Sequence, residues 1–162
     1  MAIEMRRRKQ ALSKDECIEM LKKNNAGVLN LTGLDGYPYG VPVSYVYDDG
    51  TLIFHGAKSG YRVDCARRNP KVSFTVIDEN HVVPEEYTTY FRSVIAFGEV
   101  EIIEDDAEKA KVCEILGRGI SPNESEEHLQ NEISKEMPAL LMYRLKIDHM
   151  TGKMAIELVR KK

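Results

Sequence analysis

Apolar and polar positions follow two different periods along the chain, and the change of period separates predicted helices from predicted strands. Ser13 and Glu16 form a capping box, and apolar residues at helical spacing follow it, so a first helix is expected from Ser13 to about Asn24. A period of two then predicts three strands, at residues 27–32, 40–47 and 51–56. The Asp-Gly dipeptides between them are typical of tight hairpins, so these strands are expected to be antiparallel neighbours.

The second half of the chain continues the pattern of strands with helices between them. Residues 60–68 are predicted to form a short helix, because the residue before Pro70 is excluded from helical conformation. Further strands are predicted at residues 71–77, 89–103, 139–150 and 153–159. The expected connections are a loop over 78–88, a bend at Gly98, a helix from Asp105 to Gly117, a solvated helix with a loop within 121–136, and a turn at Thr151-Gly152.

This order of elements predicts a mainly β fold. About six or seven strands, joined mostly by hairpins, favour an antiparallel barrel with peripheral helices, since parallel sheets need helical crossovers. With 162 residues, of which 43% are apolar, the chain is expected to form a single domain over 1–162, with residues 1–10 frayed.

Composition and charge narrow the classes of partner. No run approaches the roughly 20 apolar residues of a membrane span, and the basic start has no apolar stretch behind it, so no membrane contact is expected. The three cysteines, Cys17, Cys65 and Cys113, lie far apart, which favours reduced structural thiols and a cytoplasmic protein. A formal net charge of −3 argues against nucleic-acid binding.

One basic segment stands out in this acidic chain, FHGAKSGYRVDCARRNPKVSF at residues 54–74. Lys58 and Ser59 lie between two glycines where a strand meets a helix, and Arg62 follows in the first helical turn. A helix N-terminus with a lysine, a hydroxyl and a guanidinium favours a phosphate site. The spacing matches neither a Walker A loop nor a dinucleotide fingerprint, and a solvated helix face remains the alternative.

The order GVPVSYVYDDGTLIFHGAKSGYR, NPKVSFTV and YFRSVIAFGEVEII resembles the FMN-binding split β-barrel proteins related to pyridoxamine 5′-phosphate oxidase, most closely the branch of nitroimidazole-resistance proteins. The resemblance covers about residues 4–157. It implies an antiparallel split barrel and a homodimer, with FMN bound in two clefts at the subunit interface and a small-molecule substrate.

The resemblance also implies roles for individual residues. Lys58, Ser59 and Arg62 would hold the FMN phosphate, helped by the backbone at Gly56 and Ala57. The residues expected along the isoalloxazine are Pro42, Val43, Ser44 and Tyr45, with Ser93 and Val94 approaching from the partner subunit. His55 would lie near the flavin or the substrate, and is the expected proton donor because histidine titrates near neutrality.

The function expected from this pattern is an FMN-dependent oxidoreductase acting on a small acceptor, with nitroaromatic compounds as candidates. The arginine-rich C-terminal motif of true pyridoxamine phosphate oxidases is absent, which argues against vitamin B6 oxidation. A flavin-binding sensor or store and a haem-binding barrel remain alternatives; the phosphate residues favour FMN over haem. The other histidines have no metal-ligand spacing, so no metal site is expected.

Overall fold

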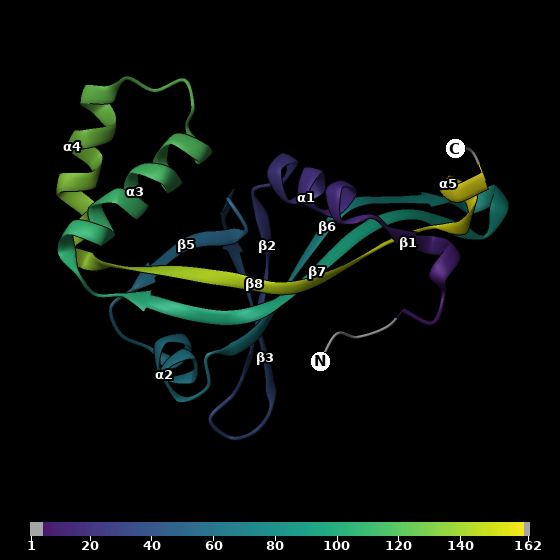
Figure 1. Ribbon diagram of the computed structural model, residues 1–162, viewed down its shortest axis with the longest axis horizontal. Helices are drawn as coiled ribbons and strands as arrows, with labels where there is room; N and C mark the ends of the chain where they lie inside the picture. The colour runs from purple at the N-terminus through teal and green to yellow at the C-terminus, as the bar shows by residue number, and fades with distance from the viewer. Residues whose placement is uncertain (1–4, 161–162) are drawn as a thin grey trace.

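The computed structural model describes residues 5–160 and contains one antiparallel sheet with helices around it (Figure 1). The strands are β1 (Ala11–Leu12), β2 (Ala26–Thr32), β3 (Pro38–Ser44), β4 (Val46–Asp48), β5 (Thr51–Ala57), β6 (Lys71–Val83), β7 (Thr88–Ile103) and β8 (Leu140–Met154). The α-helices are α1 (Lys14–Lys23), α2 (Tyr61–Arg68), α3 (Asp106–Ile120), α4 (Glu126–Glu136) and α5 (Ile156–Arg160). Short 3₁₀ helices are η1 (Arg8–Gln10), η2 (Pro84–Glu86) and η3 (Met137–Ala139).

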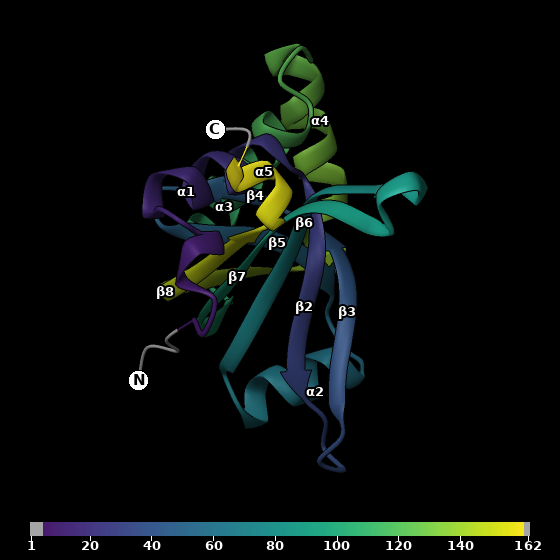
Figure 2. The ribbon, with the colours of Figure 1, turned by 90° about the vertical axis from the view of Figure 1, so that its right-hand side faces the viewer.

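The sheet closes on itself through a single residue. Its strand order is β3-β2-β6-β7-β8-β5-β4, with β1 added to β8, so β3 and β4 lie at opposite ends of the order. In the chain, however, only Tyr45 separates these two strands. Figure 2 shows how the sheet curls around. It encloses a core in which Phe54, Phe74 and Tyr143 are fully buried. The expected antiparallel barrel with peripheral helices is therefore confirmed.

Two helices complete this core and a third packs outside it. Apolar side chains of α1 and α2, among them Leu21 and Cys65, belong to the same buried cluster as the inward-facing strand residues. On the outer face of the sheet, α3 forms a second cluster with Ile53 and Met142.

The three cysteines are buried thiols, and burial, with the charge of Glu16, raises the pKa of Cys17 to about 11. Across residues 5–160, no helix is both long and apolar enough to cross a membrane.

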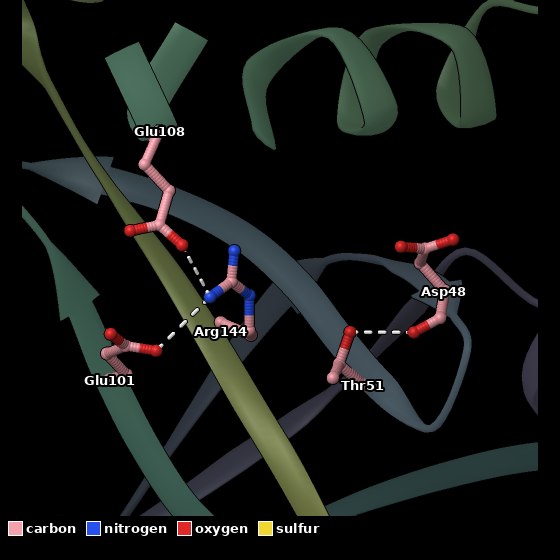
Figure 3. A network of polar contacts seen from close by, with 5 residues as sticks. All are labelled: Asp48, Thr51, Glu101, Glu108 and Arg144. Carbon is pink, nitrogen blue, oxygen red and sulfur yellow. Dashed lines mark hydrogen bonds and ion pairs between the residues drawn. The ribbon is translucent and has the colours of Figure 1, made fainter. Parts of the chain in front are cut away.

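A polar network fixes α3 against the sheet (Figure 3). Arg144 on β8 donates to Glu108 in the first turn of α3 at 2.8 Å and lies 3.3 Å from Glu101 on β7. In the nearby hairpin, the Thr51 hydroxyl donates to the carbonyl oxygen of Asp48 at 2.7 Å. These bonds hold the start of α3 over the outer face of β7 and β8.

The predicted helix starts and the predicted bend are confirmed. The Ser13 hydroxyl accepts from the Glu16 N–H at 3.2 Å, and the Glu16 carboxylate accepts from the Ser13 N–H at 2.8 Å. Asp105 accepts from the Glu108 N–H at 2.8 Å and so caps α3. The register of β7 against β8 shifts between Phe97 and Gly98, as a bulge would produce.

Several predicted boundaries are wrong. The expected loop at 78–88 is the outer part of a long hairpin, in which Val82 pairs with Thr89 and the proline lies at the tip, where no ladder bond is needed. The expected turn at Thr151-Gly152 is continuous strand, because Gly152 lies against Leu12 and Cys17. The chain then enters α5, not a further strand.

The predicted end of the second long helix and the predicted frayed segment at residues 1–10 also need correction. α3 continues past Gly117 to Ile120. Residues 1–4 of the expected frayed segment lie outside the described residues, but Arg8–Gln10 form η1. The buried Gln10 side chain donates to the carbonyl oxygen of Met154 at 3.1 Å. Residues 8–10 are therefore anchored beside the end of β8.

Asp78, at the register shift of the β6–β7 hairpin, is a buried carboxylate with two donors. Its side chain is 2% exposed and lies 2.9 Å from Lys23 Nζ and 2.9 Å from Asn24 Nδ2. Burial alone would raise the Asp78 pKa, but the hydrogen bonds from Lys23 and Asn24 and the charges of Lys23 and Arg92 hold it below its ordinary value. The ionised carboxylate thus stabilises the junction of α1 with the hairpin.

We expect Asp78→Ala to lower the free energy of unfolding at pH 7 by about 2–3 kcal/mol, the usual contribution of hydrogen bonds to a charged group. Because the folded-state pKa is lowered, this stabilisation is present above the unfolded pKa of about 4 and is lost as the pH falls through the folded value. Urea denaturation from pH 7 to pH 3 should show the difference between variant and wild type shrinking below about pH 4. The exposed Glu85→Ala is the control; equal stability of Asp78→Ala and wild type at pH 7 would contradict the assignment.

Candidate functional site

The barrel is split between β3 and β5. β5 pairs with β8 over Thr51–Ala57, but with β4 only over Thr51–Ile53. β3 continues from β4 through Tyr45 and pairs with β2, so within residues 5–160 it has no ladder to β5. The expected antiparallel hairpin at Asp49-Gly50 is thus confirmed for β4 and β5, but the β3 part of the predicted strand pairs with β2 instead. We call the gap between β3 and the outer half of β5 the split.

Tyr45 causes the split by directing the strand toward β2. Its ring is fully buried, its hydroxyl donates to the carbonyl oxygen of Leu21 at 2.9 Å, and its N–H donates to the carbonyl oxygen of Asn25 at 2.9 Å. These bonds draw the strand toward α1 and away from β5. The Tyr45 side chain is consequently part of the core, and only its main chain could follow a ligand in the split.

The other residues predicted along the isoalloxazine alternate in direction, as a strand requires. Val43 packs against the core, whereas Pro42 and Ser44 are exposed on the outer face. A ligand on the outer face would thus meet the side chains of Pro42 and Ser44 and the main chain of their neighbours.

The open edge of β5 presents hydrogen-bonding groups to the split. The carbonyl oxygen of His55 accepts from Arg62 Nη2 at 3.4 Å and so points away from β8. In an antiparallel strand the N–H and C=O of one residue point to the same side, and every second residue repeats that direction. The N–H groups of His55 and Ala57 therefore face the split.

β5 leads into a helix N-terminus that has no side-chain cap. Gly60, with φ of 130°, is the N-cap of α2 and makes no side-chain cap bond, so the first N–H groups of the helix are open. Lys58 and Ser59 are exposed beside it. In the described part of the chain, no carboxylate pairs with Lys58 or Arg62. The predicted phosphate residues are therefore brought together beside open helix N–H groups, and neither of their cations is paired with a carboxylate of residues 5–160.

The basic residues farther along α2 are used by the protein itself. Arg67 forms an ion pair with Glu104 at 2.8 Å, and Arg68 donates to the carbonyl oxygen of Leu34 at 2.6 Å. The segment that is uniformly basic in sequence is thus divided in the structure. In its first part, Lys58 and Arg62 have no carboxylate partner within residues 5–160 and lie beside the start of α2.

Arg62 is held over an aromatic ring. Its guanidinium carbon lies 5.3 Å from the centre of the Tyr143 ring, which stacks on Phe54 at 5.2 Å. The guanidinium also lies directly on Gly56, where any Cβ atom would overlap Arg62 Nη2. Glycine at this position therefore admits the guanidinium, and the cation–π contact orients it.

His55 lies on the outer face of the barrel, beside α3 and α4. Its side chain borders a pocket between these helices and the sheet. Burial lowers the His55 pKa, and the nearby Arg62 charge lowers it further. The histidine expected to act as the proton donor therefore lies beside this pocket, with a pKa below its ordinary value.

Ser93 and Val94 are not brought to the split within one chain. They lie on β7, which pairs with β6 and β8 and neighbours neither β3 nor β5. The Val94 side chain is fully buried in the core, so an approach to a ligand in the partner subunit stays a prediction for its main chain. Ser93, one residue earlier in the strand, points to the outer face. In the described chain no three His, Cys, Asp or Glu side chains lie close enough to hold a metal ion.

Sequence patterns missed two parts of this site. The contact of Arg62 with Tyr143 joins α2 to β8, and no local pattern relates these segments. The pocket beside His55 is built from α3, α4 and β8, whose apolar residues look like ordinary core in the sequence. Only the phosphate residues and the strand beside them are local enough to be found by spacing.

Comparisons with known proteins agree with this architecture. A protein of Bacteroides thetaiotaomicron, proposed to be a 5-nitroimidazole antibiotic resistance protein, is 25% identical with a TM-score of 0.71, over 89% of this chain and 86% of that one. An FAD-binding protein of Mesorhizobium loti is 24% identical with a TM-score of 0.63, over 90% and 97%. The flavocytochrome Anf3 of Azotobacter vinelandii is 22% identical with a TM-score of 0.79, over 94% and 72%.

Sequence comparison gives the family. No curated protein matches the chain. A family model, described as Pyridoxamine 5′-phosphate oxidase, matches residues 13–154, a segment that includes the whole split and every residue predicted for the site. The chain therefore belongs to the pyridoxamine 5′-phosphate oxidase family.

Proposed function

We infer that the protein binds FMN in the split and acts as an FMN-dependent oxidoreductase on a small acceptor, with nitroaromatic compounds as candidates. The observation that carries this proposal is that two groups of free N–H donors lie next to each other along the chain. The free N–H groups of β5 at His55 and Ala57 lead directly into the uncapped N-terminus of α2. A ligand with a flat polar ring at one end and a phosphate at the other fits this arrangement.

Each end of the ligand would meet different groups of the chain. Lys58, Ser59 and Arg62, with the first N–H groups of α2, would hold the phosphate through charge-assisted hydrogen bonds. One helix N-terminus with two unpaired cations suits a single phosphate group, which favours FMN over the FAD bound by the Mesorhizobium protein. Ser44 and Pro42 would border the ring from β3.

FMN would supply hydride or electron transfer, and the protein would supply orientation and electrostatics. The N–H dipoles of His55 and Ala57 point into the split and would stabilise negative charge that develops on the ring edge. His55 would be the proton donor, with a pKa that burial and the nearby Arg62 charge hold below its ordinary value. The charge of Arg62 would add to the field near the phosphate end.

A homodimer, with FMN at the two subunit-interface clefts, is part of this proposal. The outer face of β6 carries Ile77, whose side chain is 64% exposed. Ser93 pairs directly with Ile77 across the strands and lies on the same face. Burying an exposed apolar residue is favourable, and a second copy on this face would bring its Ser93 toward the split of the first.

The visible spectrum and the released cofactor test the proposal. The purified protein should show flavin absorption, and chromatography of the released cofactor should identify FMN. Light scattering should give twice the mass of one chain.

NADH or NADPH added without oxygen should bleach the flavin absorption, and a nitroaromatic compound should restore it. A Soret band, or a protein that takes up neither cofactor, would overturn the FMN site. A flavin that is never reduced by either nucleotide, nor reoxidised after chemical reduction, would indicate a sensor or store.

A further inference from the structure

An apolar pocket of about 210 Å³ lies between the α3–α4 pair and the outer face of β5 and β8. Its main lining residues are Leu116, Ile120, Leu129, Ile133, Met137 and Met142. His55 borders the same pocket at the open half of β5, and Glu132 and Glu136 lie on the α4 side. The pocket therefore adjoins the split through a single residue, His55.

The side chains of α4 are not packed as a helix in a closed core would be. Within Glu126–Glu136 no residue is buried, although Leu129 and Ile133 face the barrel. Ile120, at the end of α3, remains 40% exposed. Protein interiors are normally close-packed, and apolar surface left facing a cavity forgoes contact energy. A pocket with these walls is consequently suited to an apolar ligand.

Polar bonds around the apolar lining fix the helices and the sheet that form the walls of the pocket. Lys109 on α3 donates to the carbonyl oxygen of Met137 at 2.6 Å, which ties α3 to the end of α4. At the opposite end, Arg118 pairs with Glu126 at 2.7 Å. Arg144 fixes the start of α3 to the sheet (Figure 3). The pocket is thus formed without a ligand, as small-molecule sites usually are.

Charge and size restrict what the pocket can hold. An apolar cavity of about 150 Å³ suffices for benzene, so this volume suits one substituted aromatic ring or a short hydrocarbon chain. The carboxylates on its border, Glu132 and Glu136, each lie 3.5 Å from Lys135 Nζ on the same helix. Cys113 and Ser121 are uncharged, and no cation lines the pocket within residues 5–160. Because these two carboxylates share a single lysine, the border of the pocket keeps a net negative charge, which disfavours an anionic ring.

We propose that this pocket binds the uncharged apolar part of the substrate and presents its reactive end at His55, beside the split. The inference rests on the proposed function and narrows its substrate class to uncharged, single-ring or short-chain apolar acceptors. The lowered pKa of His55 agrees with a neutral border at this end of the pocket. The protein would thus have two compartments, a polar one for the cofactor and an apolar one for the acceptor.

Ligand-observed fluorine NMR on the full-length protein tests the pocket directly. 4-Fluorotoluene should bind saturably, and 4-fluorobenzoate, the same ring with a carboxylate, should bind at least tenfold more weakly. Ile133→Trp fills the pocket from a half-buried position and should weaken 4-fluorotoluene binding at least tenfold. Asn131→Trp, an exposed position on the same helix, should leave the affinity within twofold of wild type. Ile133→Ala, which removes the side chain without filling the pocket, should retain 4-fluorotoluene binding. Circular dichroism of each variant should show that it is folded.

Several outcomes would overturn the inference, and they differ from failure of the proposed function. Absence of saturable 4-fluorotoluene binding, equal binding of the benzoate, or unchanged affinity in Ile133→Trp would each refute it. In the flavin-loaded protein, Ile133→Trp should raise the KM for nitrobenzene but not slow reoxidation by ferricyanide, which needs no pocket. If Ile133→Trp impaired turnover with nitrobenzene and with ferricyanide equally, that result would also count against the inference. If the protein held no flavin but the NMR pattern appeared as expected, the proposed function would fail and the apolar site would stand.

Discussion

Lys58→Ala combined with Arg62→Ala is expected to weaken FMN binding by a factor of about 10² to 10⁴. Each side chain would donate a charge-assisted hydrogen bond to the phosphate, worth about 1.5–3 kcal/mol, and about 1.4 kcal/mol changes a dissociation constant tenfold. Neither cation has a carboxylate partner among residues 5–160, so its loss leaves no unpaired acid behind. Quenching of FMN fluorescence during titration of the apoprotein measures the change.

The matched control removes two other cations of the same basic segment, both of them arginines of α2. Arg67→Ala with Arg68→Ala takes away the same charge, but these side chains are bound to Glu104 and to the carbonyl oxygen of Leu34. FMN affinity should then change by no more than a general loss of positive field, which higher salt would screen. If the Lys58 and Arg62 double variant retained wild-type affinity, the phosphate would have to bind elsewhere.

Gly98→Ala is expected to cost about 3 kcal/mol of folding free energy, the upper part of the range for overpacked sites. A Cβ atom here would overlap the carbonyl oxygen of Lys146 on β8, and the next nearest atom is the carbonyl carbon of that residue. Because the obstacle is backbone at the bulge of the two longest central strands, no side-chain rotation can relieve it. For a chain of this size such a loss lowers Tm by about 6–12 °C.

Gly40→Ala is the matched control for this prediction. It also lies within a strand, but its added Cβ would come no closer than 3.2 Å to the Val28 side chain. Thermal unfolding of the two apoproteins should therefore separate a backbone collision from the general effect of placing alanine in a strand. A melting temperature for Gly98→Ala within 2 °C of Gly40→Ala would show, at the scale of about 1 kcal/mol, that the bulge can relax.

Features set by neighbouring residues could be predicted from the sequence, and features set by distant contacts could not. The capping box at Ser13 and the bend at Gly98 depend on a few adjacent residues, and both are confirmed. Gly152 was assigned to a turn by its residue type, but its small size serves packing against Cys17, from a distant part of the chain. Pro84 suggested a loop because the sequence does not show that a hairpin extends to it.

The same distinction applies to the site. The spacing of Lys58, Ser59 and Arg62 indicates a phosphate cradle, since all three belong to one loop and one helical turn. The direction of the Tyr45 ring follows from alternation, but the break of the strand at that residue depends on α1. The lowered pKa of His55 depends on burial by packed neighbours and on the approach of Arg62, and no spacing in the sequence reports either.

The loop from Lys58 to Gly60 is exposed along its whole length, whereas the barrel depends on buried residues such as Tyr45 and Phe74. Most surface substitutions change stability by less than about 0.5 kcal/mol. Mutation in this loop can therefore change ligand preference without endangering the barrel that carries it. Descendants of one ancestral chain could exchange one cofactor for another by drift at these few positions, while selection on folding keeps the rest nearly constant. The Lys58–Gly60 loop is, in this sense, a part of the molecule that is open to evolutionary change.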